Sequence, residues 1–135
     1  MPEIKKINHV AIVVEDIDSA LGFWRDVMGL DLDHIEEVQS QASKVAFLPT
    51  GGSEVELVQP TDPESGLAKY LEKRGEGMHH LCIEVENIHQ MLAKLKQNQV
   101  WLINDEPIEL PGRMMAFIHP KSANGVLIEL YEIIE

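Results

Sequence analysis

Two histidines and two glutamates recur at matching places in two similar segments of the chain. Residues 7–17 read INHVAIVVEDI and residues 78–88 read MHHLCIEVENI, so that an offset of 71 aligns His9 with His80. Each segment is followed by a glutamate within an apolar run, Glu56 in SEVELVQP and Glu129 in GVLIELYE. Buried carboxylates are costly unless they are paired or bound to a cation. The repeat therefore predicts a metal site to which each half contributes one imidazole and one carboxylate. The alternative is an old duplication whose His and Glu are structural.

The predicted ligand set has its own chemistry. Imidazole and carboxylate ligands suit a divalent ion such as Co²⁺, Zn²⁺, Ni²⁺ or Mn²⁺. Four protein ligands leave two positions of an octahedral site for a substrate that binds through two oxygens. Strand alternation places Glu54 on the same face as Glu56, which makes Glu54 a competing carboxylate. We favour Glu56 because it aligns with Glu129.

A second candidate region is the turn at residues 119–125, HPKSANG. Lys121 and Ser122 are able to bind a carboxylate or a phosphate there, although a plain loop is the alternative. His79 faces the opposite side of its strand from His80, and we expect it to make hydrogen bonds rather than bind metal. Cys82 lies inside a strand pattern and is expected in the core.

The elements that must position these residues follow from hydrophobic spacing. Strands are predicted at residues 4–14, 30–38, 44–48, 55–58, 78–85, 100–103, 114–118 and 126–131. Helical spacing covers residues 17–28, which Gly29 ends, a short segment around residues 67–71, and residues 88–95. The order βαβββ thus occurs twice. We expect one domain over residues 1–135, with modules at residues 4–60 and 77–134 and a connector at residues 61–76.

The composition narrows the class of protein. A net charge of −12 over 135 residues argues against nucleic acid and anionic membrane surfaces as partners. A single cysteine excludes an internal disulfide and fits a reducing compartment, and no apolar run reaches the length of a membrane span. The N-terminus runs directly into a strand pattern without a signal peptide. A cytoplasmic protein is therefore expected.

Three segments resemble the vicinal-oxygen-chelate (glyoxalase-like) superfamily: residues 8–30, residues 77–88 (GMHHLCIEVENI) and residues 117–132 (FIHPKSANGVLIELYE). Within it, the chain is most similar to the methylmalonyl-CoA epimerase family, because HPKS followed by GVLIEL is typical of those enzymes. The resemblance implies an α+β fold in which two tandem βαβββ modules form a curved mixed sheet. It also places the metal ligands of the family on His9, Glu56, His80 and Glu129.

The resemblance further implies a reaction. The expected substrate is an acyl-CoA, inverted at C2 by removal and return of a proton through a metal-stabilised enediolate. Glu129 and Glu56 are the expected bases. Co²⁺ is the first choice of cofactor, and Zn²⁺, Ni²⁺, Mn²⁺ and Mg²⁺ are alternatives. Exposed sheet edges favour a homodimer.

The chain departs from the epimerase pattern around the substrate. It has Gln41-Ala42-Ser43 before its third strand, and Val45 where some members place a second catalytic Glu. Its loop before the penultimate strand is only Pro111-Gly112-Arg113. Two other functions stay open: a lactoylglutathione lyase-type glyoxalase, and a non-catalytic protein that binds a small molecule in the same fold.

Overall fold

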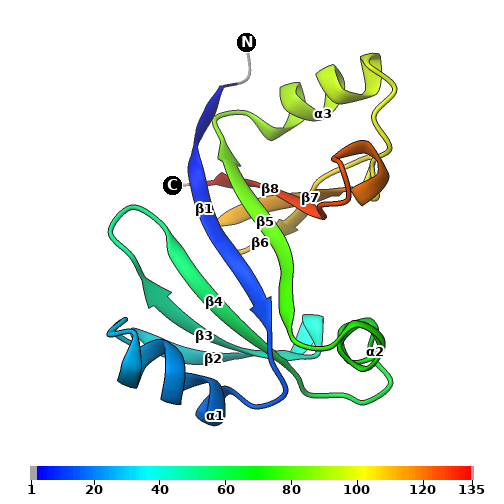
Figure 1. Ribbon diagram of the computed structural model, residues 1–135. Coiled ribbons are helices and arrows are strands. Elements are labelled where there is room, and N and C mark those ends of the chain that lie inside the picture. The colour runs from blue at the N-terminus through cyan, green and yellow to red at the C-terminus, as the bar shows by residue number, and fades with distance from the viewer. Residues whose placement is uncertain (1–2, 135) are drawn as a thin grey trace. The chain divides into compact units, whose positions relative to one another are not determined.

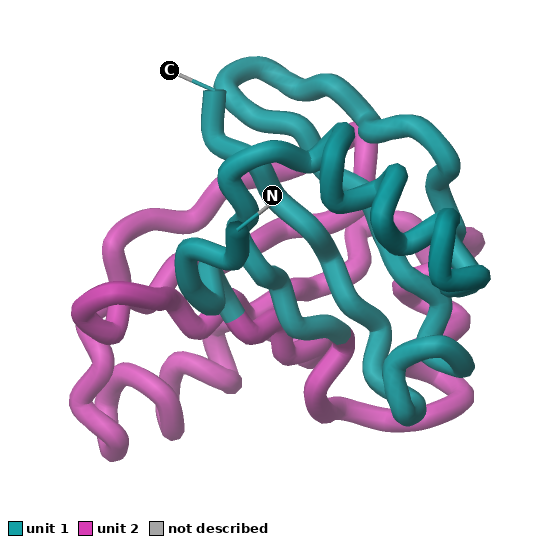
Figure 2. The backbone as a smooth tube through the Cα atoms, turned by 90° about the horizontal axis from the view of Figure 1, so that it is seen from above, with its two compact units in different colours: residues 1–9, 80–135 teal, residues 10–79 magenta. Residues whose placement is uncertain are grey.

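The structure, a computed structural model, describes residues 3–134. The chain forms two compact units, one of residues 10–79 and one of residues 1–9 together with 80–135 (Figure 2). None of the helices within residues 3–134 combines the length and hydrophobicity needed to cross a bilayer.

The predicted βαβββ order is present twice (Figure 1). The first run contains β1 (Ile4–Val13), α1 (Ile17–Leu21) with a π-helical continuation (Gly22–Val27), β2 (His34–Val38), a 3₁₀ turn (Gln39–Gln41), β3 (Ser43–Pro49) and β4 (Glu54–Pro60). Helix α2 (Gly66–Arg74) precedes the second run, which contains β5 (Gly77–Val85), α3 (Ile88–Gln97), β6 (Ile108–Leu110), β7 (Arg113–Ile118), a 3₁₀ turn (Pro120–Ser122) and β8 (Ile128–Ile133). The strands form a mixed sheet in the order β2-β3-β4-β1-β5-β8-β7-β6. The predicted fold class is confirmed. The predicted boundaries of the two modules stay a prediction, since the compact units divide the chain at other residues.

In the unit of residues 10–79, the helix predicted at residues 17–28 is present, and its second half is π-helical. Its first turn is capped by Asp16, whose carboxylate accepts a hydrogen bond from the backbone N–H of Ser19 at 2.9 Å. Gly29 follows the helix with φ of 93°, a conformation that favours glycine. The helix buries its apolar side against strands β3 and β4 in a cluster formed by Val14, Ile17, Leu21, Ala46, Leu48 and Leu57.

In the unit of residues 1–9 and 80–135, β5 pairs in parallel with β8, and β8 pairs antiparallel with β7. Helix α3 contributes to a core that also contains Val85, Ala116, Ile118 and Leu130. Because side chains alternate along a strand, the residues between these point to the other face of the sheet. On that other face, Cys82 and Phe117 each lie opposite Glu129 in the strand registers. The helix thus covers one face, and the polar residues lie on the other.

The predicted strand at residues 100–103 is wrong. This segment forms only a single bridge, between Leu102 and Ile118, and the edge strand β6 begins later. Asn104 gives the reason, because its side-chain oxygen accepts the backbone N–H of Phe117 at 2.9 Å. A side chain thereby takes a position that a strand carbonyl would occupy, and regular pairing stops. The strand predicted at residues 30–38 likewise begins only at His34.

Candidate metal centre

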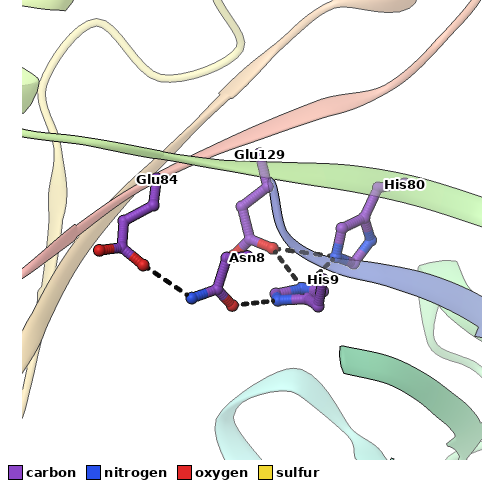
Figure 3. A network of polar contacts seen from close by, with 5 residues as sticks. All are labelled: Asn8, His9, His80, Glu84 and Glu129. Carbon is purple, nitrogen blue, oxygen red and sulfur yellow. Dashed lines mark hydrogen bonds and ion pairs between the residues drawn. The ribbon is translucent and has the colours of Figure 1, made fainter. Parts of the chain in front are cut away.

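Three side chains bring their ligand atoms to one point in the unit of residues 1–9 and 80–135 (Figure 3). The Glu129 Oε1 atom lies 2.9 Å from His80 Nε2 and 3.2 Å from His9 Nε2. The two Nε2 atoms are 3.2 Å apart. The residues come from β8, β5 and β1, so three strands that are distant in sequence supply one ligand each. The structure therefore brings together three of the four residues predicted as ligands.

The surroundings hold both imidazoles in place. His9 is only 2% exposed, and its ring packs edge-to-face on those of His80 and Tyr131, at centroid distances of 5.3 and 5.7 Å. The His80 side chain is 13% exposed, and its ring packs edge-to-face on that of Phe117. Aromatic contacts of this kind restrict the tilt of each ring. His9 is thus the buried member of the pair, and His80 is nearer to solvent.

The carboxylate of Glu129 is ionised in this environment. Burial by itself raises the pKa of Glu129, since a charged form is poorly solvated there. Hydrogen bonds from His80, then from His9, outweigh burial and hold the pKa of Glu129 at about 2. At neutral pH the site therefore has a buried negative charge that requires a proton or another cation between its acceptor atoms.

The donor set fits a divalent metal ion. Ligands at right angles around an ion about 2.1 Å away lie about 3 Å from one another. The three separations of 2.9, 3.2 and 3.2 Å are close to this value. Two imidazole nitrogens and one carboxylate oxygen are ligands that first-row divalent ions accept. His9, His80 and Glu129 thus suit a divalent metal ion in both chemistry and spacing.

Cys82 is a further potential ligand that sequence reasoning assigned only to the core. It is fully buried, as expected, yet its sulfur belongs with His9 and Glu129 to a group whose ligand atoms lie within 4.8 Å of one another. The set with His80 in place of Cys82 is tighter, with no separation above 3.2 Å. The spacing of the set with His80 is therefore closer to that of ligands around one ion. The signal that could have revealed Cys82 is its spacing, two residues after His80 on the same strand face.

The sequence did not predict a second layer of polar residues, which lies next to His9 (Figure 3). His9 Nδ1 lies 2.7 Å from the Asn8 side-chain oxygen, and the Asn8 amide nitrogen donates to Glu84 at 3.0 Å. Lys5 lies 3.6 Å from the other oxygen of Glu84. Glu84 is only 6% exposed. Its position two residues beyond Cys82 places it on the ligand-bearing face, but nothing in the sequence indicates its contact with Asn8.

Three further residues were predicted to belong to the site, Glu56, Lys121 and Ser122. Glu56 belongs to the unit of residues 10–79, where it lies opposite Phe47 in the β3–β4 register, and its place in the ligand set stays a prediction. Ser122 accepts the backbone N–H of Trp101 at 2.8 Å, and Lys121 is exposed on the same turn. Their role in substrate binding also stays a prediction. The ring of His79 packs edge-to-face on that of Tyr70, and the hydrogen bonds expected for His79 stay a prediction.

Comparison with known proteins decides the family. The sequence pattern of the Glyoxalase/Bleomycin resistance protein/Dioxygenase superfamily matches residues 8–117. The chain belongs to this superfamily. The mitochondrial methylmalonyl-CoA epimerase of Mus musculus is 35% identical over 130 residues, covering 95% of this chain and 73% of that protein. The resemblance inferred from the sequence is therefore confirmed.

Solved structures agree with the fold. A hypothetical protein of Bacillus halodurans C-125 superposes with a TM-score of 0.91 at 43% identity, over 96% of this chain and 95% of its own. Methylmalonyl-CoA epimerase in complex with methylmalonyl-CoA and NH4+ superposes with a TM-score of 0.88 at 30% identity, over 97% of this chain and 96% of its own. The predicted glyoxalase-like fold is thus confirmed.

Proposed function

We propose that this protein is a methylmalonyl-CoA epimerase, an isomerase that inverts C2 of its substrate with a divalent metal ion held by His9, His80 and Glu129. The observation that carries the proposal is the convergence of two imidazole nitrogens and one buried carboxylate within 3.2 Å of one another. The relatives support the substrate, since the mouse protein is named for this reaction and one superposed epimerase is bound to methylmalonyl-CoA.

The residues of this chain account for the proton transfer. The C2–H bond breaks, a carboxylate base takes the proton, and the electron pair moves toward the thioester oxygen. A conjugate acid on the opposite face then returns a proton to C2. A divalent ion, when bound, supplies positive charge that stabilises the negative charge developing on that oxygen. We assign the two bases to Glu56 and Glu129, as the resemblance implies.

Glu129 has two assigned roles that make opposite demands. A pKa of about 2 makes it a good anionic ligand and a weak base. That pKa depends on hydrogen bonds from His80 and His9, so any change in those contacts alters the basicity of Glu129. Ligation is therefore its first role. Its role as a base rests on substrate altering the contacts around its carboxylate.

Proton exchange with solvent tests the function. Methylmalonyl-CoA is incubated with metal-loaded protein in D₂O, and the C2 proton is followed by proton NMR. An epimerase removes this signal at both epimers. A lactoylglutathione lyase leaves it in place and converts the hemithioacetal of methylglyoxal and glutathione instead. A non-catalytic binding protein changes neither compound, and either of these two outcomes overturns the proposal.

The finer assignments are part of the proposal. Two nitrogen ligands and a carboxylate suit Co²⁺, our first choice, and also Zn²⁺, Ni²⁺ or Mn²⁺, whereas Mg²⁺ prefers oxygen ligands alone. Lys121 and Ser122 are assigned to an anionic group of the acyl-CoA.

Strands β2 and β6 end the sheet order, and such edges favour a homodimer. A reduced Cys82 fits the cytoplasm. Light scattering of the purified protein tests the dimer.

A further inference from the structure

We propose that Trp101, stacked on His119, binds the adenine ring of the acyl-CoA, and that Lys121 binds a phosphate of the same nucleotide. The inference rests on the proposed function and names where the nucleotide end of that substrate binds. All three residues belong to the unit of residues 1–9 and 80–135. His119 and Lys121 lie in the turn that joins β7 to β8 (Figure 1), and Trp101 follows α3.

The two rings form a fixed stack. Their centroids are 3.7 Å apart, and their planes differ by 9°. The backbone N–H of His119 donates to the Trp101 carbonyl at 2.8 Å, and the backbone N–H of Trp101 donates to Ser122 Oγ at 2.8 Å. His119 Nδ1 accepts the backbone N–H of Lys121 at 3.0 Å. The stack is therefore held by the turn before a ligand arrives, which lowers the cost of ordering it on binding.

One face of the indole is open. Trp101 is 51% exposed, although His119 covers one face of its ring. Much of the exposed area therefore belongs to the opposite face. A planar aromatic ligand is the kind that covers such a face, and every nucleobase has a π-face that stacks on aromatic side chains. The exposed indole thus fits a base better than an aliphatic group.

The stack lies on the face of the sheet that bears Glu129. Leu102 forms a bridge with Ile118, and both side chains pack in the core to which α3 contributes. Because side chains alternate, the neighbouring Trp101 and His119 point to the other face. That other face is the one on which Glu129 lies, opposite the helix. A ligand on Trp101 therefore shares a face with the candidate metal centre.

The separation suits a long substrate. The ring of Phe117 packs on that of His80 at a centroid distance of 6.0 Å. His119 comes two residues after Phe117, about 7 Å further along an extended chain. The pantetheine arm of an acyl-CoA joins the reacting thioester to the nucleotide, and when extended it is long enough for this distance. The acyl group and the adenine can therefore occupy the two places at once.

The turn also supplies the charge that a nucleotide requires. Residues 119–125, HPKSANG, contain one lysine and no acidic residue, in a chain with a net charge of −12. Lys121 is exposed and follows His119 by two positions. An ammonium group binds phosphate as a point charge. Stacking and charge thus favour the same ligand, an adenine that carries phosphates.

The first test follows the fluorescence of Trp101. The chain has two tryptophans, so Trp24→Phe leaves Trp101 as the single indole. Adenosine 3′,5′-bisphosphate, which is the nucleotide portion of CoA, should quench this fluorescence in a saturable manner. Pantetheine, which lacks the adenine, should not. If Trp24→Phe does not fold, titration calorimetry of the unaltered protein with the same two compounds replaces fluorescence.

The second test removes the indole. Trp101→Ala should raise the Kd for adenosine 3′,5′-bisphosphate and the KM for methylmalonyl-CoA about 10-fold or more, the scale of one lost base-stacking contact. The kcat should stay the same, because the contact is equal in the ground and transition states. Trp101→Phe keeps an aromatic ring and should recover much of the affinity. Phe23→Ala is the matched control, since Phe23 is 52% exposed and packs on the ring of Trp24. It should change neither constant.

Three results overturn the inference: an unchanged Kd for the bisphosphate in Trp101→Ala, equal quenching by pantetheine, or a change of oligomeric state in Trp101→Ala without loss of nucleotide affinity. Proton exchange at C2 separates this failure from that of the proposed function. Exchange that continues while Trp101→Ala has no effect on KM removes the stacking site alone. Saturable binding of the bisphosphate at Trp101 without any exchange removes the enzymatic function alone.

Discussion

The two copies of the repeated segment contribute unequally to the same site. Both place a histidine at the same point, and the two Nε2 atoms lie 3.2 Å apart. The copies differ beside and beyond that histidine. Asn8 precedes His9 where His79 precedes His80, and Val13 in the first copy corresponds to Glu84 in the second. The Asn8 side chain contacts His9 through its oxygen and Glu84 through its nitrogen. The residue beside the first histidine therefore contacts a carboxylate from the second copy.

The comparison distinguishes positions that are alike in the two copies from positions that differ. One of the pairs that remain alike, His9 and His80, brings its Nε2 atoms together in the site. Two of the positions that diverged, Asn8 and Glu84, form the second layer beside His9, which is buried, whereas His80 lies nearer to solvent. Similar sequence therefore indicates a shared location and leaves the role of each copy to be found from its contacts.

Removing either histidine tests what the two copies share. His9→Ala and His80→Ala each delete one ligand, so metal content after purification should fall below that of any outer-layer variant, for which losses of about 10- to 100-fold in affinity are usual. In metal-free protein, His9→Ala should lower the melting temperature more than His80→Ala does, because loss of the more deeply buried imidazole leaves a space beside the buried Glu129. Elemental analysis and thermal unfolding measure both. Full metal content in either variant would contradict ligation.

Glu129→Gln tests the carboxylate that both histidines contact. Gln keeps the shape and an oxygen ligand but removes the negative charge and the base. Metal should be largely retained, while epimerisation should fall by about 10² or more, the usual scale for a lost general base. Exchange of the C2 proton in D₂O should become one-sided if Glu56 serves the opposite face. Near-normal exchange at both epimers would leave Glu129 as a ligand only.

The pH dependence of stability should reflect the same carboxylate. The folded-state pKa of Glu129, about 2, lies below its ordinary value of 4.5, so the charged form stabilises the metal-free fold. This contribution is complete above about pH 4.5 and is lost as the pH falls toward 2, with a size on the order of a few kcal/mol. Urea unfolding of metal-free protein across this range should show it, and Glu129→Gln should lack it. Equal pH dependence in both proteins would exclude the contribution.

Chelation should sharpen the comparison between the two copies. An ion that binds only the folded state stabilises it by about 2.7 kcal/mol when its concentration is about 100 times the dissociation constant. A chelator should therefore lower the melting temperature of the unaltered protein. It should have little effect on His80→Ala, which has already lost the ion. A chelator effect of the same size in both proteins would indicate that the ion binds elsewhere.

Site residues that recur in the repeat could be predicted from the sequence. Contacts that depend on which residues of two neighbouring strands lie opposite each other could not. The repeat, together with the cost of burying an unpaired carboxylate, predicts His9, His80, Glu129 and, on the same grounds, Glu56, whose place in the ligand set stays a prediction. The Asn8–Glu84 contact joins β1 to β5 across 76 residues, and alternation alone does not determine which residues of two strands lie opposite each other. The edge strand was misplaced for a similar reason, because the Asn104 side chain replaces a backbone partner of Phe117.

The central claim is that His9, His80 and Glu129 hold one divalent ion. X-ray absorption by cobalt-loaded protein tests it most directly, because imidazole, carboxylate and thiolate ligands produce distinct signals and bond lengths. The account predicts two imidazole nitrogens, with oxygen atoms in the remaining positions and no sulfur, since Cys82 lies outside the tighter set. A spectrum with one imidazole or with a sulfur ligand would contradict it.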